Sequence, residues 1–353
     1  MIICRTPFRI SFFGGGTDYP AWYRNHGGAV LATTIDKYCY LTCRHLPPFF
    51  EHRIRIVYRR IETCKTVDDI RHPVVRAVLK HLDFQRGLEL HHDGDLPARS
   101  GMGSSSAFSV GLLQAIHALG GRLRSKMQLA LDSIHIEQDI IGETVGSQDQ
   151  VMAAFGGLRY VQFHTDGKIT ADPLPLPPDR LSELHSHLML FYTGIPRTAS
   201  DVARTYVGNI DSHRQCLQEM RRQVEEAIDI LVSGMDIRAF GKLMHEAWLA
   251  KRSLSKLVSP PEVDALYETA REAGALGGKL TGAGGGGFLI LFVPPKQQAG
   301  VRETLNSLLH VPFSLEASGS QIMVYEPGID YREVEQHESR PRTTSMKEFA
   351  RAG

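Results

Sequence analysis

Residues 96–107 read Leu-Pro-Ala-Arg-Ser-Gly-Met-Gly-Ser-Ser-Ser-Ala, and this stretch decides the fold. Two glycines and three serines precede an apolar periodic run at residues 108–119, which predicts a loop that leads into a helix. The N–H groups and the positive dipole end at a helix start favour an anion, and glycine lets a phosphate approach the backbone. The stretch therefore indicates a phosphate site, although an ordinary capped helix would carry the same residues.

The charge balance of the chain disfavours some classes of partner. The 353 residues contain 40 Lys and Arg against 39 Asp and Glu, a formal net charge of +1. A protein that binds nucleic acid or an anionic membrane surface usually carries a clear excess of positive charge. We therefore expect neither partner, and the length predicts one large domain or two domains that share an interface.

The cysteines and the N-terminal residues indicate in which cellular compartment the protein is expected. The five cysteines are odd in number and include no Cys-x-x-Cys pair, which is typical of reduced thiols rather than of a disulfide framework or a zinc site. The first residues enter a strand-like run that is too short for a signal peptide, and no apolar stretch reaches membrane-spanning length. We expect a soluble, cytoplasmic protein.

A second glycine-rich segment follows the first predicted strand. Residues 2–13 alternate and then run apolar, and residues 14–19 read Gly-Gly-Gly-Thr-Asp-Tyr. Glycine lets the backbone approach a ligand closely, and Thr17 and Asp18 add a hydroxyl and a carboxylate that suit a ligand rich in hydroxyl groups. A hairpin turn capped by Asp18 is an equally good interpretation of this segment alone.

One carboxylate is predicted to lie on the buried face of a helix. Ser125 and Gln128 match a capping box, and apolar residues at helical spacing follow them. At 100° per residue, Glu137 falls within that apolar stripe. A buried carboxylate needs a partner, which a magnesium ion beside the phosphate loop or a buried Lys or Arg would supply equally well.

A second carboxylate follows in a polar segment. Asp149 stands in a connection bounded by glycines, shortly after the predicted buried helix. Its placement permits a role as general base. On spacing alone, a helix N-cap is the simpler interpretation.

Prolines at residues 173–178 indicate a domain boundary. Before it, we predict strands at residues 28–45, 53–61, 87–91 and 158–163, and a helix at residues 72–82. After it, we predict a strand at residues 187–192, helices at 199–233, 236–257 and 260–273, a strand at 288–293, a helix at about 297–309 and two closing strands. This order is typical of an α+β chain.

Two common phosphate-binding motifs do not fit the glycine loops. The loop at residues 101–106 lacks the third glycine of the dinucleotide-binding fingerprint, and no Gly-Lys pair in the chain is followed by Ser or Thr, as a P-loop requires. A third glycine-rich segment, Lys-Leu-Thr-Gly-Ala-Gly-Gly-Gly-Gly, occupies residues 279–287. Together with residues 7–19 and 96–107, it resembles the three motifs of the GHMP (galactokinase, homoserine, mevalonate and phosphomevalonate) kinases, in the family order. The resemblance extends to about residue 326.

The resemblance implies the GHMP kinase fold. We expect a ribosomal-protein-S5-like N-terminal domain at residues 1–178 and a ferredoxin-like C-terminal α/β sandwich at residues 179–353, with the active site between them. Six residues of the second motif would contact the phosphates of ATP: Gly101, Met102, Gly103, Ser104, Ser105 and Ser106. Ser105 and Glu137 would hold Mg²⁺.

The resemblance also implies roles at the reacting groups. Asp149 matches the catalytic aspartate, and Arg9 matches the basic residue near the transferred phosphoryl group. Gly16, Thr17 and Asp18 match the part of the first motif that meets the acceptor sugar. A kinase of this type takes a small-molecule substrate, and a homodimer is compatible with it.

One departure from the galactokinase pattern bears on which sugar receives the phosphoryl group. Residues 14–16 are three glycines where galactokinases carry Gly-Glu-His, which argues against galactose. Residues 14–20, 26–30, 35–38 and 192–199 look most like the bacterial kinases that phosphorylate the anomeric hydroxyl of D-glycero-D-manno-heptose 7-phosphate, on the route to GDP-heptose. Arg197 and Lys251 would then hold the sugar phosphate, although a surface ion pair is the simpler interpretation of each. A fucose-type kinase and a catalytically silent regulator that binds ATP and sugar are the alternatives.

Overall fold

The structure, a computed structural model, describes residues 1–98, 100–195, 199–328 and 331. Within them, a sheet of nine strands follows the path β13-β1-β2-β5-β3-β4, with β6 and β12 paired to β2 and β7 paired to β6. Its strands are β1 (Ile2–Phe13), β2 (Gly28–His45), β3 (Ile54–Val57), β4 (Ile61–Cys64), β5 (Leu88–Gly94), β6 (Arg159–Phe163), β7 (Ile169–Pro173), β12 (Leu315–Glu316) and β13 (Gln321–Tyr325).

The two longest strands form the centre of this sheet. β1 and β2 pair antiparallel from Ile2 opposite Cys43 to Phe13 opposite Leu31, as their β-branched and aromatic residues predict. The predicted strand at residues 53–61 is instead the hairpin β3–β4, because the chain turns at residues 58–60. That prediction was wrong in extent, since alternation alone does not mark the turn.

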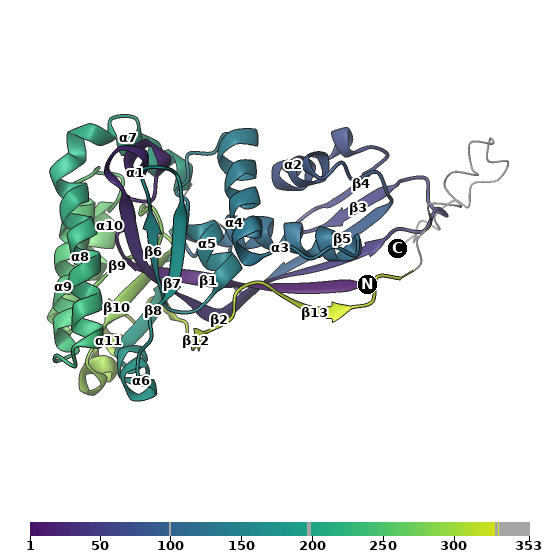
Figure 1. Cartoon of the computed structure of the whole chain (residues 1–353). Helices are drawn as coiled ribbons and strands as arrows, with labels where there is room; N and C mark the ends of the chain where they lie inside the picture. The colour runs from purple at the N-terminus through teal and green to yellow at the C-terminus, as the bar shows by residue number, and fades with distance from the viewer. Residues whose placement is uncertain (99, 196–198, 329–330, 332–353) are drawn as a thin grey trace.

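Helices cover one face of the first sheet (Figure 1). They are α2 (Pro73–His81), α3 (Ser104–Leu119), α4 (Lys126–His135) and α5 (Gln148–Phe155), and α1 (Pro20–His26) follows the first glycine loop. α3 packs on β1 and β2. Most of its residues are buried, because it lies between the sheet and the neighbouring helices α2, α4 and α5.

The predicted capping box is present at the start of α4. The Ser125 side chain accepts from the Gln128 backbone N–H, and the Gln128 side chain accepts from the Ser125 backbone N–H. α4 continues as one π-helical turn, η2 (Ile136–Ile140), and the chain leaves it at Gly142, whose φ is 78°. This turn holds Glu137 fully buried, as the apolar stripe predicts.

A second, antiparallel sheet has the order β11-β8-β10-β9. Its strands are β8 (Leu188–Tyr192), β9 (Gly277–Leu280), β10 (Phe288–Phe292) and β11 (Leu309–His310). The helices of this half are α6 (Pro178–Ser186), α7 (Ala199–Val207), α8 (Arg214–Val232), α9 (Arg238–Arg252), α10 (Pro261–Glu272) and α11 (Gln298–Thr304). α8 and α9 lie side by side (Figure 1); α8 contacts β1 and β2, and α9 contacts β9, so this helix pair joins the two sheets.

The end of the chain returns to the first sheet. The second sheet does begin after residue 178, but β12 pairs with β2 and β13 pairs with β1. The predicted division at residues 178/179 therefore misplaces the closing strands, because their partners lie more than 270 residues away in sequence. The α+β class is confirmed.

Two predicted helices have different extents in the structure. The segment at residues 199–233 contains α7 and α8, separated by a turn and a short 3₁₀ helix at Ile210–His213. The helix expected at about residues 297–309 is only α11, preceded by a 3₁₀ turn at Pro295–Gln297. In both places the apolar spacing continues across a turn, so periodicity overestimates helix length.

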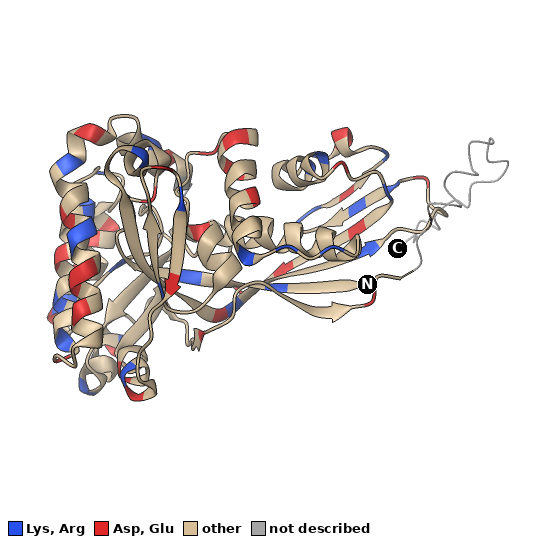
Figure 2. Ribbon diagram, viewed as in Figure 1, with Lys and Arg blue, Asp and Glu red and all other residues tan. Residues whose placement is uncertain are grey.

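Charged residues are mixed rather than gathered by sign (Figure 2). On α8, for example, Arg222 lies between Glu219 and Glu226 and pairs with both carboxylates. Among the described helices, none is both long enough and apolar enough to cross a membrane.

Candidate active site

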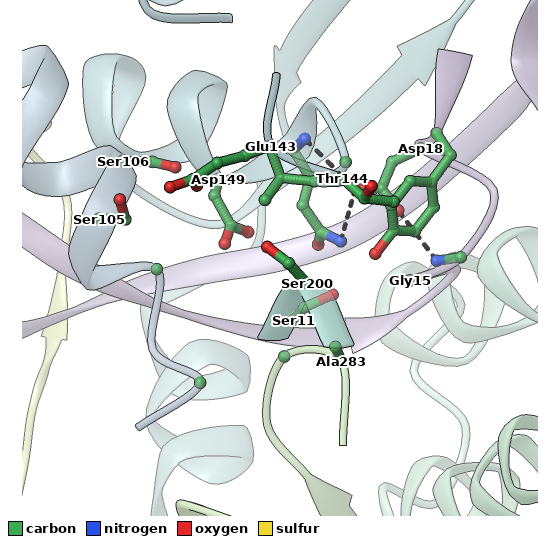
Figure 3. A pocket seen from close by; sticks show the side chains of 18 of the residues that line it. Ser11, Gly15, Asp18, Ser105, Ser106, Glu143, Thr144, Asp149, Ser200 and Ala283 are labelled. Atoms are coloured by element: carbon green, nitrogen blue, oxygen red, sulfur yellow. Dashed lines mark hydrogen bonds between the residues drawn. The ribbon is translucent and has the colours of Figure 1, made fainter. Parts of the chain in front are cut away.

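A cavity of about 220 Å³ lies where the glycine loops meet (Figure 3). Its walls are the first loop at residues 15–19, the second loop at residues 101–106, the segment at residues 143–149, and Lys251 with Gly282 and Ala283 from the second half. Segments from both halves thus form one site, as the resemblance implies.

The second loop is shaped by two glycines in left-handed conformation. Gly101 has φ 86° and Gly103 has φ 74°, and Gly103 is the N-cap of α3. A Cβ on Gly103 would lie 3.2 Å from Arg9 Cγ and 3.5 Å from Asp149 Oδ2, so the loop approaches this pair closely. Five of the six predicted phosphate contacts line the cavity: Gly101, Gly103, Ser104, Ser105 and Ser106.

Met102 is the exception in that loop. Its side chain is fully buried in the core, and its backbone oxygen accepts a hydrogen bond of 3.0 Å from the Arg9 backbone N–H. Met102 therefore anchors the loop to β1, and the predicted phosphate contact does not apply to its side chain.

Arg9 and Asp149 form a bidentate ion pair. Arg9 Nε donates to Asp149 Oδ1 at 2.7 Å, and Arg9 Nη2 donates to Asp149 Oδ2 at 2.9 Å. Arg9 Nη1 donates to the Gly101 oxygen at 2.6 Å, which ties the pair to the second loop. Ser147, not Asp149, is the N-cap of α5, so the N-cap interpretation was wrong. Both charged side chains line the cavity.

Glu137 has hydrogen-bond donors around its carboxylate in place of a cation. Ser106 Oγ donates at 2.9 Å, Gln150 Nε2 donates at 2.6 Å, and Ser109 Oγ also donates. In the described part of the chain, no Lys or Arg pairs with Glu137, so the salt-bridge alternative finds no support there. Burial raises the pKa of Glu137 from 4.5 to about 7, although the hydrogen bonds from Ser109, Ser106 and Gln150 oppose the rise.

The donor set around Glu137 fits a metal ion that arrives with a nucleotide. Glu137 and Ser105 both line the cavity, and Ser105 is exposed there, whereas Ser106 is buried and bonded to Glu137. Over the described residues, no group of three or more His, Cys, Asp or Glu could hold a metal by itself. Mg²⁺ is often held by one or two carboxylates together with phosphate oxygens and water, so one carboxylate and one hydroxyl are compatible with it.

Asp18 is buried at the other end of the cavity. Its Oδ1 accepts from the Gly16 N–H at 2.9 Å, and its Oδ2 accepts from Gln148 Nε2 at 2.9 Å. Burial raises the pKa of Asp18, with a smaller contribution from the Asp149 charge, and these hydrogen bonds lower it. A Cβ on Gly146 would lie only 1.9 Å from Asp18 Oδ2, so the chain packs directly on this carboxylate.

Thr17 differs from its prediction as a sugar contact. It is fully buried, and its hydroxyl donates to the Gly14 and Ala29 oxygens at 2.9 Å and accepts from the Ala29 N–H at 3.0 Å. Its one O–H already serves the backbone, and Thr17 is not among the residues that line the cavity, so a sugar in the cavity does not meet this hydroxyl. Gly16 and Asp18 line the cavity as expected, and Thr17 holds their loop in place.

Lys251 lies inside the cavity, 3% exposed, and its Nζ donates to the Gly282 oxygen. The surface ion pair considered for it was therefore wrong. Lys279, from the third glycine segment, is also buried, and its Nζ donates to the Phe12 oxygen at 3.1 Å. Burial, with the neighbouring Lys251 and Arg9 charges, lowers the pKa of Lys279 well below its ordinary value. Arg197 lies outside the described residues.

Several lining residues had no sequence signal of their own. Ser11, Glu143, Thr144, Gln148, Ser200 and Tyr206 also face the cavity. Ser11 belongs to the strand pattern of residues 2–13, and Gln148 stands beside the singled-out Asp149. Their side chains reach the cavity only because β1, α5 and α7 converge there.

Two family descriptions match the chain. "GHMP kinases N terminal domain" matches residues 70–157, and "GHMP kinases C terminal" matches residues 214–310. These segments include the second loop, Glu137 and Asp149 in the first half, and the third glycine segment in the second half.

Relatives of known activity are similar over most of the chain. A Campylobacter jejuni protein named D-glycero-alpha-D-manno-heptose 7-phosphate kinase is 28% identical over 307 residues, which cover 83% of this chain and 90% of the relative. A Bacteroides fragilis L-fucokinase/L-fucose-1-P guanylyltransferase is 28% identical over 345 residues, which cover 84% of this chain but 35% of the relative.

Solved structures share the fold. A D-glycero-D-manno-heptose 1-phosphate kinase from Bacteroides thetaiotaomicron superposes with a TM-score of 0.76 at 22% identity, over 92% of this chain and 100% of the other. A Lactococcus lactis galactokinase complexed with galactose superposes with a TM-score of 0.68 at 19% identity, over 91% and 94%. At these identities the superpositions establish the fold alone.

Proposed function

Because the chain belongs to the GHMP kinase family, we propose that it is an ATP-dependent sugar kinase whose acceptor is the anomeric hydroxyl of D-glycero-D-manno-heptose 7-phosphate. The product is the 1,7-bisphosphate, a precursor of nucleotide-activated heptose for surface polysaccharide, made in the cytoplasm. The observation that carries the proposal is the Arg9–Asp149 pair, which lies against the glycine-serine loop in the wall of one cavity.

The chain's own residues would position the reacting groups. The loop at residues 101–106 and the start of α3 present N–H groups and a positive dipole end to the ATP phosphates. Asp149 would orient the acceptor hydroxyl and take its proton on a carboxylate oxygen. Arg9 holds that carboxylate through two hydrogen bonds and adds positive charge beside the transferred group.

Ser105 and Glu137 are the residues that would hold Mg²⁺. The ion, when bound, neutralises charge on the phosphate oxygens. Glu137 is suited to this role because it is buried, faces the cavity and pairs with no cation among the described side chains. Ser106 and Gln150 hold the Glu137 carboxylate in its orientation through hydrogen bonds to Oε2.

A phosphorylated acceptor needs a cation in its part of the cavity. Lys251 supplies one, because it lines the cavity close to the first glycine loop. Asp18 faces the same space and would accept hydrogen bonds from sugar hydroxyls. We keep Arg197 as a second candidate for the sugar phosphate on the resemblance alone.

An acceptor screen followed by phosphorus NMR tests the proposal. The purified chain with Mg·ATP is given heptose 7-phosphate, mannose, mannose 6-phosphate or fucose, and the position of the new phosphate is read from its coupling to the sugar. We expect rapid turnover of heptose 7-phosphate and a new phosphate at the anomeric carbon. Preference for an unphosphorylated sugar, or phosphate at another carbon, would contradict the assignment.

Substitution of the cations refines that screen. Lys251→Met and Arg197→Ala should each raise KM for heptose 7-phosphate more than KM for the unphosphorylated heptose, because only the former carries the anion. Arg222→Ala, on the outer face of α8, serves as the control for loss of a positive charge. Equal effects on both sugars would remove the substituted residue from the phosphate contact.

A fucose-type kinase is the second candidate. It is favoured by the similarity to the Bacteroides fragilis protein named L-fucokinase/L-fucose-1-P guanylyltransferase, 35% of which the match covers. The fucose arm of the screen separates the two candidates. A catalytically silent regulator is disfavoured because Arg9 and Asp149 face the cavity as a formed pair, and release of ADP with any acceptor would exclude it.

A further inference from the structure

Three polar atoms from three separate elements converge over Gly15. A Cβ on Gly15 would lie 3.5 Å from Ser11 Oγ, 3.5 Å from Gln148 Nε2 and 3.7 Å from Lys251 Nζ. These side chains come from β1, α5 and α9, and all three line the cavity. The missing side chain at Gly15 therefore leaves a small polar recess in the cavity wall.

Backbone conformation does not explain the glycine at this position. Gly14 and Gly16 have φ values of 81° and 127°, which disfavour other residues, whereas Gly15 is not among the glycines with positive φ. The distances around a Cβ at Gly15 are ordinary van der Waals contacts. The chain could therefore carry alanine here without strain, and the consequence of the glycine is open space in the cavity wall.

Two residues that border the recess each have a buried polar atom without a partner. Ser11 is 2% exposed and Gln148 is 8% exposed, and neither Ser11 Oγ nor Gln148 Oε1 finds a hydrogen-bond partner among the described residues. Buried polar atoms of this kind are unfavourable unless a partner is supplied. Since both residues line the cavity, a ligand in the recess can supply it.

Asp18 determines how Gln148 presents its amide. The Gln148 NH₂ group donates to Asp18 Oδ2 at 2.9 Å, because a carboxylate accepts hydrogen bonds. The carbonyl oxygen of the same amide is thereby left as an acceptor. Ser11 Oγ can both donate and accept.

The charges around the recess favour a neutral group over an anion. Lys251 Nζ donates to the Gly282 oxygen at the edge of the recess, where its positive charge can act on an acceptor phosphate that lies outside the recess. An anion in the recess would stand close to the Asp18 carboxylate and beside the Gln148 amide, whose oxygen needs a donor and not another acceptor. A hydroxyl group can donate to Gln148 Oε1 and accept from Ser11 Oγ, so it satisfies both orphan atoms without opposing charge.

We propose that Ser11, Gly15 and Gln148 form a subsite that recognises one hydroxyl of the acceptor, distinct from the hydroxyl that receives the phosphoryl group. This rests on the proposed function in that the acceptor is a sugar. Ser11 and Gln148 supply the hydrogen bonds, and Gly15 supplies the room. The subsite makes acceptor choice depend on a hydroxyl that takes no part in the chemistry.

Ser11→Ala and Gly15→Ala test the subsite. Kinetics are measured with the acceptor found in the screen and with analogues that each lack one hydroxyl. We expect Ser11→Ala to raise KM for the acceptor about 3- to 10-fold while kcat and KM for ATP stay unchanged. Gly15→Ala should raise it at least 10-fold, because the methyl group fills the recess. Gly300→Ala, in α11 with open space around its Cβ, is the matched glycine control.

The analogues identify the recognised hydroxyl. Wild-type enzyme should discriminate against the analogue that lacks it, and Ser11→Ala should treat that analogue and the parent sugar nearly alike. Thermal melting should be unchanged in Ser11→Ala, because the hydroxyl it removes has no partner among the described residues.

The outcomes separate this subsite from the proposed acceptor. If wild type phosphorylates heptose 7-phosphate and both variants match it for every sugar, the subsite is overturned and the proposed function stands. If wild type prefers another sugar and Ser11→Ala still loses discrimination at one hydroxyl, the subsite stands and the proposed acceptor is overturned. Equal loss of kcat for all sugars in both variants would also overturn the subsite, since it would point to damage at the reacting groups.

Discussion

Two regions of the cavity hold their carboxylates in opposite ways. At the end nearest α3, Glu137 is fully buried and is surrounded by hydroxyl and amide donors, with no cation paired to it in the described ranges. Beside the second loop, Asp149 is bound through both oxygens to the guanidinium of Arg9. One carboxylate is left without a compensating charge, and the other has a built-in partner.

This difference indicates different roles. A carboxylate that is buried without a cation is unstable in its ionised form, which is why the pKa of Glu137 rises to about 7. Such a group gains most when a metal ion binds beside it. A carboxylate in a bidentate pair is instead fixed in orientation, as a group that must meet a hydroxyl proton requires.

The largest expected effect concerns Asp149. Asp149→Ala should lower kcat by about 10²- to 10⁴-fold, since it removes the group that accepts the proton. Nucleotide binding should survive, because the loop at residues 101–106 is intact; fluorescence titration with an ATP analogue checks this. Asp149→Asn is the matched variant, with the same shape and no charge. Near-normal turnover in either variant would remove Asp149 from the catalytic role.

The raised pKa of Glu137 should make the free energy of unfolding depend on pH. Because burial raises its pKa from 4.5 to about 7, the folded chain binds more protons than the unfolded chain between these values. The free energy of unfolding of the metal-free protein should therefore fall as pH rises from about 4.5 to 7, with a contribution from this group of about 3 kcal/mol. Denaturant unfolding in a chelator measures it.

Glu137→Gln is the control for that slope. The amide keeps the shape of the side chain and cannot ionise. The difference between the unfolding free energies of wild type and variant at each pH therefore gives the contribution of Glu137 alone, because the histidines contribute equally to both. Parallel profiles for wild type and variant would show that Glu137 does not carry the raised pKa.

Loss of the same carboxylate should also weaken metal use. Glu137→Gln should raise the Mg²⁺ concentration for half-maximal activity about 10- to 100-fold, because one oxygen ligand loses its charge. Initial rates at fixed ATP and varied Mg²⁺ give this value. Asp139→Asn, on the exposed side of the same π-helical turn, is the matched control. An unchanged requirement for Mg²⁺ would show that Glu137 is not a metal ligand, so the two carboxylates would not differ in this role.

The smallest effect should distinguish the two neighbouring serines. Ser105→Ala removes an exposed hydroxyl that lines the cavity and should raise the Mg²⁺ requirement several-fold with little change in thermal stability. Ser106→Ala removes a donor to buried Glu137 and should lower the free energy of unfolding by about 1–2 kcal/mol. The reverse pattern, measured by Mg²⁺ titration and denaturant unfolding, would make Ser106 the ligand and Ser105 a cap.

Much of the site could be predicted because its signals are local. Helical periodicity put Glu137 on a buried face, and the glycines at residues 101 and 103 marked the loop before α3. The family resemblance added Arg9 and Asp149, which the structure brings within 2.7 Å although they are 140 residues apart.

Other features required contacts that no local pattern contains. Thr17 was expected to meet a sugar, yet its hydroxyl serves the backbone of Gly14 and Ala29. From the sequence, a surface ion pair is the simpler interpretation of Lys251, yet this residue of helix α9 is buried and lines the cavity. Ser11 and Gln148 had no distinguishing sequence signal, because an unpartnered buried atom is visible only once its neighbours are in place.

By itself, the sequence determined the α+β class, the order of the three glycine loops, the glycine-serine loop before α3 and the buried carboxylate, since each depends on residues close together in the chain. The tertiary structure decided which side chains face one cavity, how each carboxylate is compensated, and where the last strands pair. These features depend on burial and on contacts between distant segments. The hydrogen-bond partners of a buried side chain are fixed only when the whole chain has packed.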